Sequence, residues 1–320
     1  MNPDHPTHYL LGVTGYPLGH SLSPWLHGAA LRACGLMGEY SLFPILPLPA
    51  GQEDLEALIN SFREGHLDGL NVTIPHKQAV IPYLDELSPL ALQIGAVNTI
   101  YRHGKRLIGD NTDAPGFIAD LKQQFPQAKS PQSAIILGAG GSARAVAHAL
   151  LTAGWHITIA ARRLDMAIEI KDRFSFISEQ CDVSKPCDVI ELCKLPQHIL
   201  NMDALQPGQQ AKKSSVLGFN KPPLTLIVNT TPVGMFPDMT SSPWPKDLPF
   251  PGDVFVYDLV YNPVDTALVN AARMAGLMAA SGLGMLIEQA ALAFERWTGM
   301  RPPLTAMSQE VFTNTSAHFA

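Results

Sequence analysis

The sequence predicts an α/β protein with two domains. Its 320 residues are roughly twice the length of a typical single domain. Short apolar runs typical of strands alternate with stretches typical of helices, which favours sheets covered by helices. Residues 134–160 form one strand–helix–strand unit with a glycine-rich turn after its first strand. We therefore expect an N-terminal α/β domain and a doubly wound, Rossmann-like domain.

The elements of the N-terminal domain follow one another at short intervals. A turn at residues 103–105 is expected to join its last two strands. Ser23 is expected to cap the first helix, with Pro24 at the first helical position. The predicted strands are 9–14, 40–46, 69–74, 96–101 and 106–109, and the predicted helices are 24–34 and 54–64.

The second domain begins where the chain leaves this unit, near residue 111. A polar, proline-containing stretch over 126–133 is expected to be a linker. Residues 178–222 are polar and show no readable pattern, so we treat them as an insertion. The predicted strands are 134–137, 156–160, 224–229, 254–259 and 277–280, and the predicted helices are 117–125, 142–153, 266–275 and 285–297.

Composition limits the classes of partner. The net charge of −6 argues against non-specific binding to nucleic acid or to an anionic membrane, since both need a basic face. Residues 1–8 do not resemble a signal peptide, and no apolar run is long enough to span a bilayer, so we expect a cytoplasmic protein. The cysteines lack the close pairs of zinc sites, and we expect reduced thiols and no metal at Cys34, Cys181, Cys187 and Cys193.

A dinucleotide site is indicated by Gly138-x-Gly140-x-x-Ala143, which follows a predicted strand and opens a predicted helix. Gly138 permits a tight turn, Gly140 lets the backbone approach a pyrophosphate, and Ala143 allows close packing of helix and strand. The free N–H groups at the helix start would face the phosphate charge. The alternative is a glycine-rich turn without a ligand.

The end of the second strand of this unit indicates which dinucleotide binds. An acidic residue there usually holds the ribose of NAD, but this strand ends in Ala161-Arg162-Arg163. Two guanidinium groups suit a 2′-phosphate, so NADP is favoured, while Asp165 nearby leaves NAD open. The alternative is that both arginines are solvated surface charges.

Four polar clusters, at 20–24, 71–77, 95–99 and 109–113, follow predicted strands or lie in the turns after them. Ligands bind at such strand ends in α/β sheets, and the Ser, Thr and Asn content favours a hydroxylated small molecule. Lys77 is the best candidate for giving a proton to the alkoxide that hydride transfer produces, with Asp113 as its partner. The alternatives are a surface lysine and a helix-capping aspartate.

These clusters resemble the motifs of the shikimate dehydrogenase family. The similar stretches occur in the family's order at 15–24, 71–77, 95–99, 111–113, 228–235, 258–263 and 282–290. The resemblance implies a substrate domain of residues 1–111 and 282–320, to which the C-terminal helices return, and an NADP-binding domain of residues 112–281. It also implies reversible NADPH-dependent reduction of 3-dehydroshikimate to shikimate.

The resemblance also implies roles for individual residues. Lys77 and Asp113 would be the catalytic pair. The substrate would be bound by Ser21, Ser23, Asn71, Thr73, Asn98, Tyr261 and Gln289. The cofactor would be bound by Gly138, Ala139, Gly140, Gly141, Ser142, Ala143, Arg162, Arg163, Thr230, Met235 and Gly282.

Two departures from the family pattern leave alternatives open. The family often has Asn-Arg-Thr where this chain has Ala161-Arg162-Arg163, and the stretch 163–229 is longer than usual by about 30 residues, a length that loops tolerate cheaply. The alternative functions are a quinate or dual shikimate/quinate dehydrogenase using NAD or NADP, and a non-catalytic ligand sensor on the same fold. A monomer and a homodimer are both open.

Overall fold

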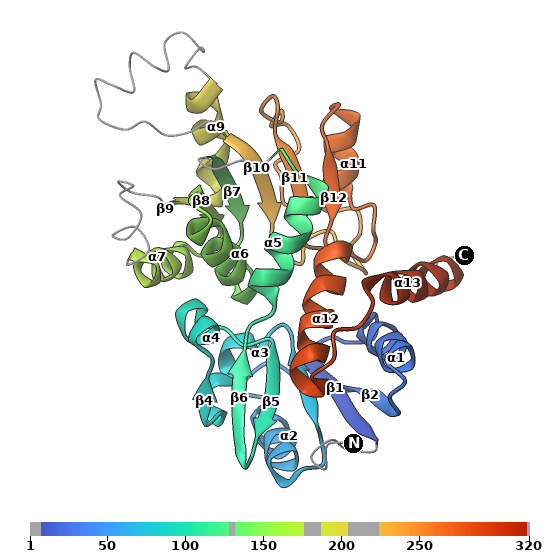
Figure 1. Cartoon of the computed structure of the whole chain (residues 1–320). Helices are drawn as coiled ribbons and strands as arrows, with labels where there is room; N and C mark the ends of the chain where they lie inside the picture. Colours follow the sequence, from blue (N-terminus) through green and yellow to red (C-terminus); the bar gives the residue numbers. More distant parts are fainter. Residues whose placement is uncertain (1–7, 128–131, 176–186, 204–223, 319–320) are drawn as a thin grey trace. The chain divides into compact units, whose positions relative to one another are not determined.

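The computed structural model describes residues 8–127, 132–175, 187–203 and 224–318. The chain divides into two compact units, one of Met1–Gly116 with Leu286–Ala320 and one of Phe117–Met285. Each unit contains a six-stranded sheet, and helices lie against both sheets (Figure 1). The predicted α/β fold class, with a Rossmann-like second unit, is therefore confirmed.

The sheet of the first unit is mixed. Its strand order is β2-β1-β3-β5-β6-β4, and β5 runs antiparallel to both of its neighbours. A two-residue turn at 104–105 explains this reversal, because so short a connection can join only antiparallel strands. The strands are β1 (Tyr9–Gly15), β2 (Gly38–Pro44), β3 (Gly69–Val72), β4 (Glu86–Leu87), β5 (Thr99–His103) and β6 (Arg106–Asp110).

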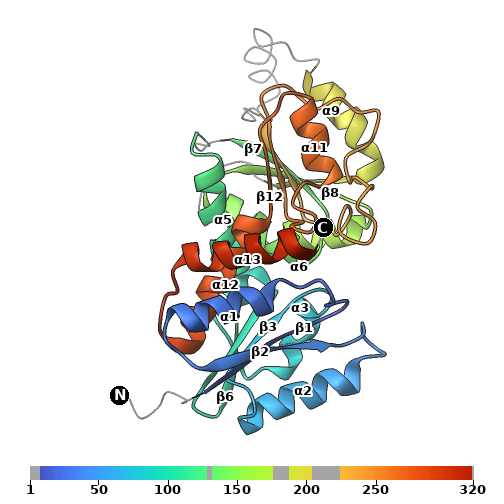
Figure 2. The same ribbon diagram turned by 90° about the vertical axis from the view of Figure 1, so that its right-hand side faces the viewer.

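Helices cover both faces of this sheet, with α1 and α2 on opposite sides (Figure 2). Helix α2 buries Leu55, Ile59 and Phe62 at helical spacing against the strands. On the other face the indole of Trp297 lies so close to Gly69 that a Cβ there would overlap it. The helices are α1 (Ser23–Ala33), α2 (Gln52–Glu64), α3 (His76–Ala79), α4 (Pro89–Ile94), α13 (Leu304–His318) and the short η1 (Ile81–Tyr83).

Two further helices connect the units along the chain. Helix α5 (Asp113–Gln124) begins in the first unit and ends in the second. Helix α12 (Leu283–Thr298) begins in the second unit and ends in the first. The polypeptide therefore passes between the units twice, and both passages are helical.

The sheet of the second unit is entirely parallel, in the order β12-β11-β10-β7-β8-β9. All its strands therefore end at the same edge. The order reverses between β7 and β10, and ligands of open parallel sheets bind outside the strand ends at such a point. The strands are β7 (Ser133–Leu137), β8 (His156–Ala161), β9 (Cys187–Glu191), β10 (Leu224–Asn229), β11 (Phe255–Asp258) and β12 (Ala279–Ser281).

Aromatic and aliphatic side chains fill the space between this sheet and its helices. Phe125 of α5 stacks on Phe255 of β11 with ring centroids 4.7 Å apart. Leu195 and Trp244 belong to one buried cluster that also includes Leu268 of α11. The helices are α6 (Gly141–Thr152), α7 (Leu164–Arg173), α9 (Leu195–Asp203), α11 (Ala267–Met274) and the short η2 (Leu192–Lys194).

The structure corrects two local predictions. Ser23 does not cap α1, because it is already the first helical residue, and its backbone N–H donates instead to Oγ of Ser21 at 3.3 Å. Within 178–222, residues 187–203 form β9, η2 and α9, and β9 extends the central sheet beside β8. The rest of that stretch lies outside the described residues.

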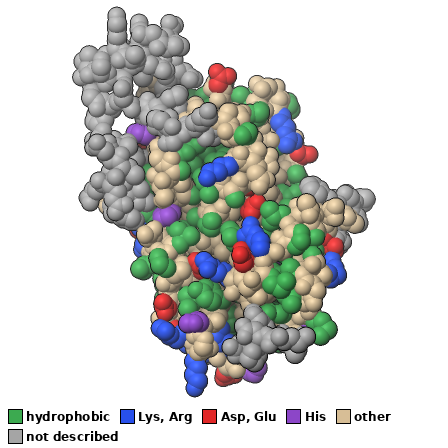
Figure 3. Space-filling model, viewed as in Figure 1, with side chains coloured by type: hydrophobic (Ala, Val, Ile, Leu, Met, Phe, Trp, Pro, Cys, Tyr) green, Lys and Arg blue, Asp and Glu red, His purple; other side chains and the backbone are tan. Residues whose placement is uncertain are grey.

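The described residues also bear on the cysteines and on membrane insertion. Cys34, Cys187 and Cys193 form no disulfide bond among the described residues, and Cys181 lies outside the described part. None of the helices within the described ranges has the length and apolar character that crossing a bilayer requires. On the face shown in Figure 3, acidic and basic side chains of the described residues are interspersed.

Candidate active site

A buried ion pair lies in the first unit. Lys77 belongs to α3, which follows β3, and Asp113 is the first residue of α5, which follows β6. Lys77 Nζ lies 2.6 Å from Asp113 Oδ2, and the two side chains are 11% and 6% exposed. A buried ion pair is costly unless further hydrogen bonds satisfy it, so its surroundings decide whether it can persist.

Asn98 supplies the second hydrogen bond to this carboxylate. Its Nδ2 lies 2.9 Å from Asp113 Oδ1 and 3.2 Å from Gln289 Oε1. Its Oδ1 accepts from the backbone N–H of Thr112 at 2.7 Å. Both oxygens of Asp113 therefore have a donor, which stabilises the ionised carboxylate beside the Lys77 ammonium. An ammonium held in this way can give a proton to a substrate oxygen and recover it.

The structure brings four of the predicted residues together in one hydrogen-bonded group, namely Lys77, Asp113, Asn98 and Gln289. Asn71 lies beside this group and donates to the Asn98 carbonyl at 3.1 Å. The remaining predicted substrate residues lie elsewhere in the chain; they are Ser21, Ser23, Thr73 and Tyr261.

Those four residues occupy different places. Ser21 and Ser23 lie at the start of α1, and Thr73 follows β3, where its backbone N–H donates to the Thr14 carbonyl at 2.9 Å. Tyr261 belongs to the second unit and follows β11. Burial of its hydroxyl raises the pKa of Tyr261 to about 12, so this side chain stays neutral over the physiological range.

The glycine-rich turn of the second unit has the geometry expected of a pyrophosphate site. Gly138 has φ +108°, and a Cβ there would lie 2.8 Å from Thr230 Oγ1 and from Thr231 Cγ2, so only glycine fits. A Cβ at Gly140 would meet no atom within 4 Å, which leaves open space in front of the helix. Helix α6 starts at Gly141, and its N-terminal dipole favours an anion there.

The other predicted cofactor residues lie around the same sheet edge. Ala143 is fully buried in α6, and the Thr230 hydroxyl donates to the Leu137 carbonyl at 2.7 Å. The Met235 N–H donates to the Pro232 carbonyl at 3.1 Å, which closes the turn after β10. Gly282 lies after β12, packed so closely against Leu259 that a Cβ would overlap its carbonyl.

A carboxylate fixes the turn after β10. Asp258, at the end of β11, accepts from Asn229 Nδ2 and from Thr266 Oγ1, each at 2.7 Å. Burial raises the pKa of Asp258 to about 6. Asn229 Oδ1 in turn accepts from the backbone N–H of Thr231 at 2.9 Å. Two stretches far apart in sequence, 228–235 and 258–263, are thus joined by hydrogen bonds, so the first holds its shape beside the glycine-rich turn.

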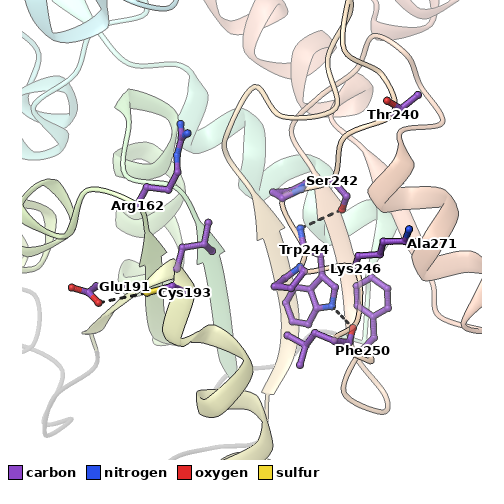
Figure 4. A pocket seen from close by; sticks show the side chains of 13 residues that line it. Arg162, Glu191, Cys193, Thr240, Ser242, Trp244, Lys246, Phe250 and Ala271 are labelled. Carbon is purple, nitrogen blue, oxygen red and sulfur yellow. Dashed lines mark hydrogen bonds between the residues drawn. The ribbon is translucent and has the colours of Figure 1, made fainter.

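Arg162 and Arg163 follow β8 at this edge, and both are exposed. Neither forms an ion pair with any residue that the structure describes. Arg162 lines a cavity of about 900 Å³. In Figure 4, Arg162 and Cys193 stand on one wall, opposite Trp244 and Phe250. The Trp244 and Phe250 rings are stacked, with centroids 5.1 Å apart. A guanidinium that faces an aromatic wall across a cavity suits a nucleoside that carries a phosphate.

Three residues that support the Asn98 and Asn71 amides were not among the predicted site residues. Tyr40 donates to Asn71 Oδ1 at 2.7 Å, and Thr99 and Thr112 bond to Asn98. The two threonines lie within the motifs at 95–99 and 111–113, so the sequence pattern could have indicated them. Tyr40 lies in a predicted strand with no motif around it, and its role follows only from the sheet.

A parallel sheet with a glycine-rich turn at a helix start, two exposed arginines at the next strand end, and a buried Lys–Asp pair define a nicotinamide-dinucleotide oxidoreductase. Family models match over residues 13–100 (shikimate dehydrogenase substrate binding domain), 133–217 (NADP oxidoreductase, coenzyme F420-dependent) and 282–312 (shikimate 5′-dehydrogenase C-terminal domain). The chain belongs to the shikimate dehydrogenase family, and the resemblance seen in the sequence is confirmed.

Individual relatives are similar over nearly the whole chain. The NADP⁺-dependent shikimate dehydrogenase of Carboxydothermus hydrogenoformans is 38% identical, covering 94% of this chain and 96% of the relative. The shikimate 5-dehydrogenase of Thermus thermophilus, solved with NADP(H) and shikimate, is 34% identical with a TM-score of 0.74, covering 94% and 98%. The quinate dehydrogenase of Corynebacterium glutamicum, solved with NAD, is 31% identical with a TM-score of 0.77, covering 96% and 99%.

Proposed function

We propose that this protein catalyses the reversible NADP-dependent reduction of 3-dehydroshikimate to shikimate. The observation that carries the proposal is the buried contact of 2.6 Å between Lys77 Nζ and Asp113 Oδ2. The relatives named shikimate dehydrogenase (NADP⁺) support the substrate and the cofactor.

The reaction adds a hydride to a carbonyl carbon and a proton to its oxygen. NADPH supplies the hydride when it is bound. The Lys77 ammonium gives the proton to the developing alkoxide, and in the reverse direction the neutral amine removes the hydroxyl proton. Asp113 orients the ammonium and holds its charge, as their contact of 2.6 Å allows. Asn98 and Gln289 offer amide groups to ring hydroxyls.

The remaining predicted residues complete the proposal. Thr73 and Asn71 would contact the substrate, and Ser21 and Ser23 would bind its carboxylate, with Tyr261 assisting at that end. The open space at Gly140 and the start of α6 would hold the pyrophosphate, with Ala139 and Ser142 beside it. Arg162 and Arg163 would hold the 2′-phosphate, with adenine in the cavity that Arg162 lines. Thr230, Met235 and Gly282 would face the nicotinamide.

Steady-state rates on shikimate and quinate, each with NADP⁺ and NAD⁺, test this assignment. We expect the highest kcat/KM for shikimate with NADP⁺. Lys77→Ala should lower kcat by roughly 10²- to 10⁴-fold, which is the usual contribution of a positioned acid or base. A higher kcat/KM for quinate with NAD⁺ would favour the quinate alternative. Binding of both ligands without turnover would favour the sensor.

The choice between monomer and homodimer and the cytoplasmic location stay predictions. Light scattering of the purified protein decides the first, and fractionation of the source cells decides the second.

A further inference from the structure

A chain of hydrogen bonds leads from an edge strand of the first unit to Asp113. Tyr40 Oη lies 2.7 Å from Asn71 Oδ1, and Asn71 Nδ2 lies 3.3 Å from Thr99 Oγ1. Thr99 Oγ1 lies 3.1 Å from Asn98 Oδ1, and Asn98 Nδ2 lies 2.9 Å from Asp113 Oδ1. All members except Tyr40, which is half-buried, are at most 6% exposed.

The orientation of the Asn98 amide follows from the chemistry of its neighbours. The backbone N–H of Thr112 can only donate, and it lies 2.7 Å from Asn98 Oδ1. The opposite end of the amide, Nδ2, must therefore face Asp113, whose ionised carboxylate can only accept. If the amide were turned over, its NH₂ group would face the Thr112 N–H, donor against donor. Its oxygen would face the Asp113 carboxylate, acceptor against acceptor.

The orientation of the Asn71 amide follows in the same way. Its Nδ2 lies 3.1 Å from the carbonyl oxygen of Asn98, which can only accept. Asn71 Oδ1 therefore faces Tyr40, and the phenol must be the donor in that bond. Because Nδ2 also donates to Thr99 Oγ1, the single hydroxyl hydrogen of Thr99 is directed onward, to Asn98 Oδ1 or to Thr112 Oγ1.

Either route leads to Asn98, because Thr112 Oγ1 lies 3.2 Å from Asn98 Oδ1 and can donate to it, so the donors of the chain all point toward Asp113. Aligned hydrogen bonds polarise one another, and their last donor acts on the carboxylate that contacts Lys77. The chain stabilises the ionised form of Asp113 and fixes the amide that also contacts Gln289. Its interior members are buried, so water cannot easily replace a lost link.

Tyr40, the first member of this chain of hydrogen bonds, is held in place by its neighbours. Tyr40 is on β2, and its ring stacks on His27 of α1 with centroids 4.4 Å apart and planes 2° apart. Strand β1 lies between β2 and β3, and its Leu11 and Val13 pair with Tyr40 and Asn71, two residues apart, so both side chains lie on one face. The phenol therefore reaches across β1 to the Asn71 amide.

We propose that Tyr40 and Asn71 are positioning residues that act on the catalytic pair through Asn98. The proposal rests on the proposed function. It assigns Asn71, which was expected to bind substrate, the additional role of linking Tyr40 to Asn98. Four hydrogen bonds separate Tyr40 from Asp113 along this chain, so its effect is indirect.

Tyr40→Phe tests the proposal, because it removes only the hydroxyl and leaves the ring on His27. We expect kcat/KM for shikimate to fall roughly fivefold, which is the equivalent of one neutral hydrogen bond. The pH profile of kcat/KM should also shift, because the lost donor changes how the network stabilises the charges of the Lys77–Asp113 pair. KM for NADP⁺ should not change. The control is Tyr83→Phe. It removes a hydroxyl that lies 3.4 Å from Glu56 in the same unit but does not belong to this chain of hydrogen bonds.

Thr99→Val interrupts the same chain in the middle and keeps the side-chain shape. It should shift the pH profile in the same direction, and the double variant with Tyr40→Phe should lose less than the sum of the two single losses. The proposal is overturned if Tyr40→Phe keeps the wild-type pH profile, or if the two losses add. Absence of turnover by the wild-type enzyme on shikimate would instead overturn the proposed function.

Discussion

Replacing Arg162 tests whether the protein selects NADP over NAD. This arginine lines the cavity, it is exposed, and no acidic side chain among the described residues pairs with it. Arg162→Ala should therefore raise the Kd of NADPH roughly 10- to 100-fold, the usual value of a charge-assisted bond, and leave the Kd of NADH almost unchanged. Titration calorimetry with both nucleotides measures the two constants.

NADH serves as the internal control for that variant, because it lacks the phosphate that Arg162 would bind. Equal weakening of both nucleotides would mean that Arg162 supports the fold of the site and does not select the phosphate.

His27 predicts how stability depends on pH. Its ring is fully buried between Tyr40 and Trp297, and burial lowers its pKa from 6.5 to about 3. Since the unfolded chain takes up a proton at His27 near pH 6.5 and the folded chain does not, this contribution is complete above pH 6.5 and is lost as the pH falls toward 3. The free energy of unfolding should decrease by about 1.4 kcal/mol per pH unit in that window from this residue alone.

Urea unfolding between pH 7 and pH 4.5 measures that slope. His27→Phe keeps an aromatic ring and removes the uptake of about one proton on unfolding, so the free energy of unfolding should depend less steeply on pH. His103→Phe, at an exposed position, should leave the slope unchanged. An unchanged slope in His27→Phe would contradict the assignment.

At the scale of elements, substitutions at two glycines of the turn between β7 and α6 should affect stability and cofactor binding separately. Gly138→Ala should destabilise the protein by roughly 1 to 3 kcal/mol, because its φ of +108° and its contacts of 2.8 Å exclude a Cβ. Gly140→Ala meets no protein atom, so it should change stability by less than about 1 kcal/mol. The same methyl group would enter the space proposed for the pyrophosphate, so NADPH affinity should fall at least tenfold, by about 1.4 kcal/mol.

Thermal unfolding and calorimetry on the two variants provide the comparison, and each variant is the control for the other. Full NADPH affinity in Gly140→Ala would place the pyrophosphate elsewhere.

At the scale of the whole molecule, the two units should respond to different ligands. Hydrogen exchange followed by mass spectrometry should show that NADP⁺ alone protects amides near 138–143 and 162–163 in the second unit. Shikimate alone should protect 71–77 and 98–113 in the first, because bound ligands suppress local opening where they bind. Protection of only the first unit by NADP⁺ would overturn the assignment of sites to units.

The extent of prediction from sequence differs between elements for a physical reason. Strands β7 and β10 are apolar runs bounded by turn residues, and the sequence predicted them within one residue of the observed ends. Strand β9 (Cys187–Glu191) has acidic residues at its second and last positions, so no apolar run marked it. Its identity as a strand comes from pairing with β8, which is a long-range contact.

By itself, the sequence determined the fold class, the glycine-rich turn and the candidate catalytic pair, because each depends on local residue patterns that recur in the family. Only the tertiary structure decided that Lys77 and Asp113, 36 residues apart, meet at 2.6 Å, and that Tyr40 is connected to them through Asn71 and Asn98. Hydrogen bonds across a sheet depend on strand order and register, and neither of these is encoded in any short stretch of the chain.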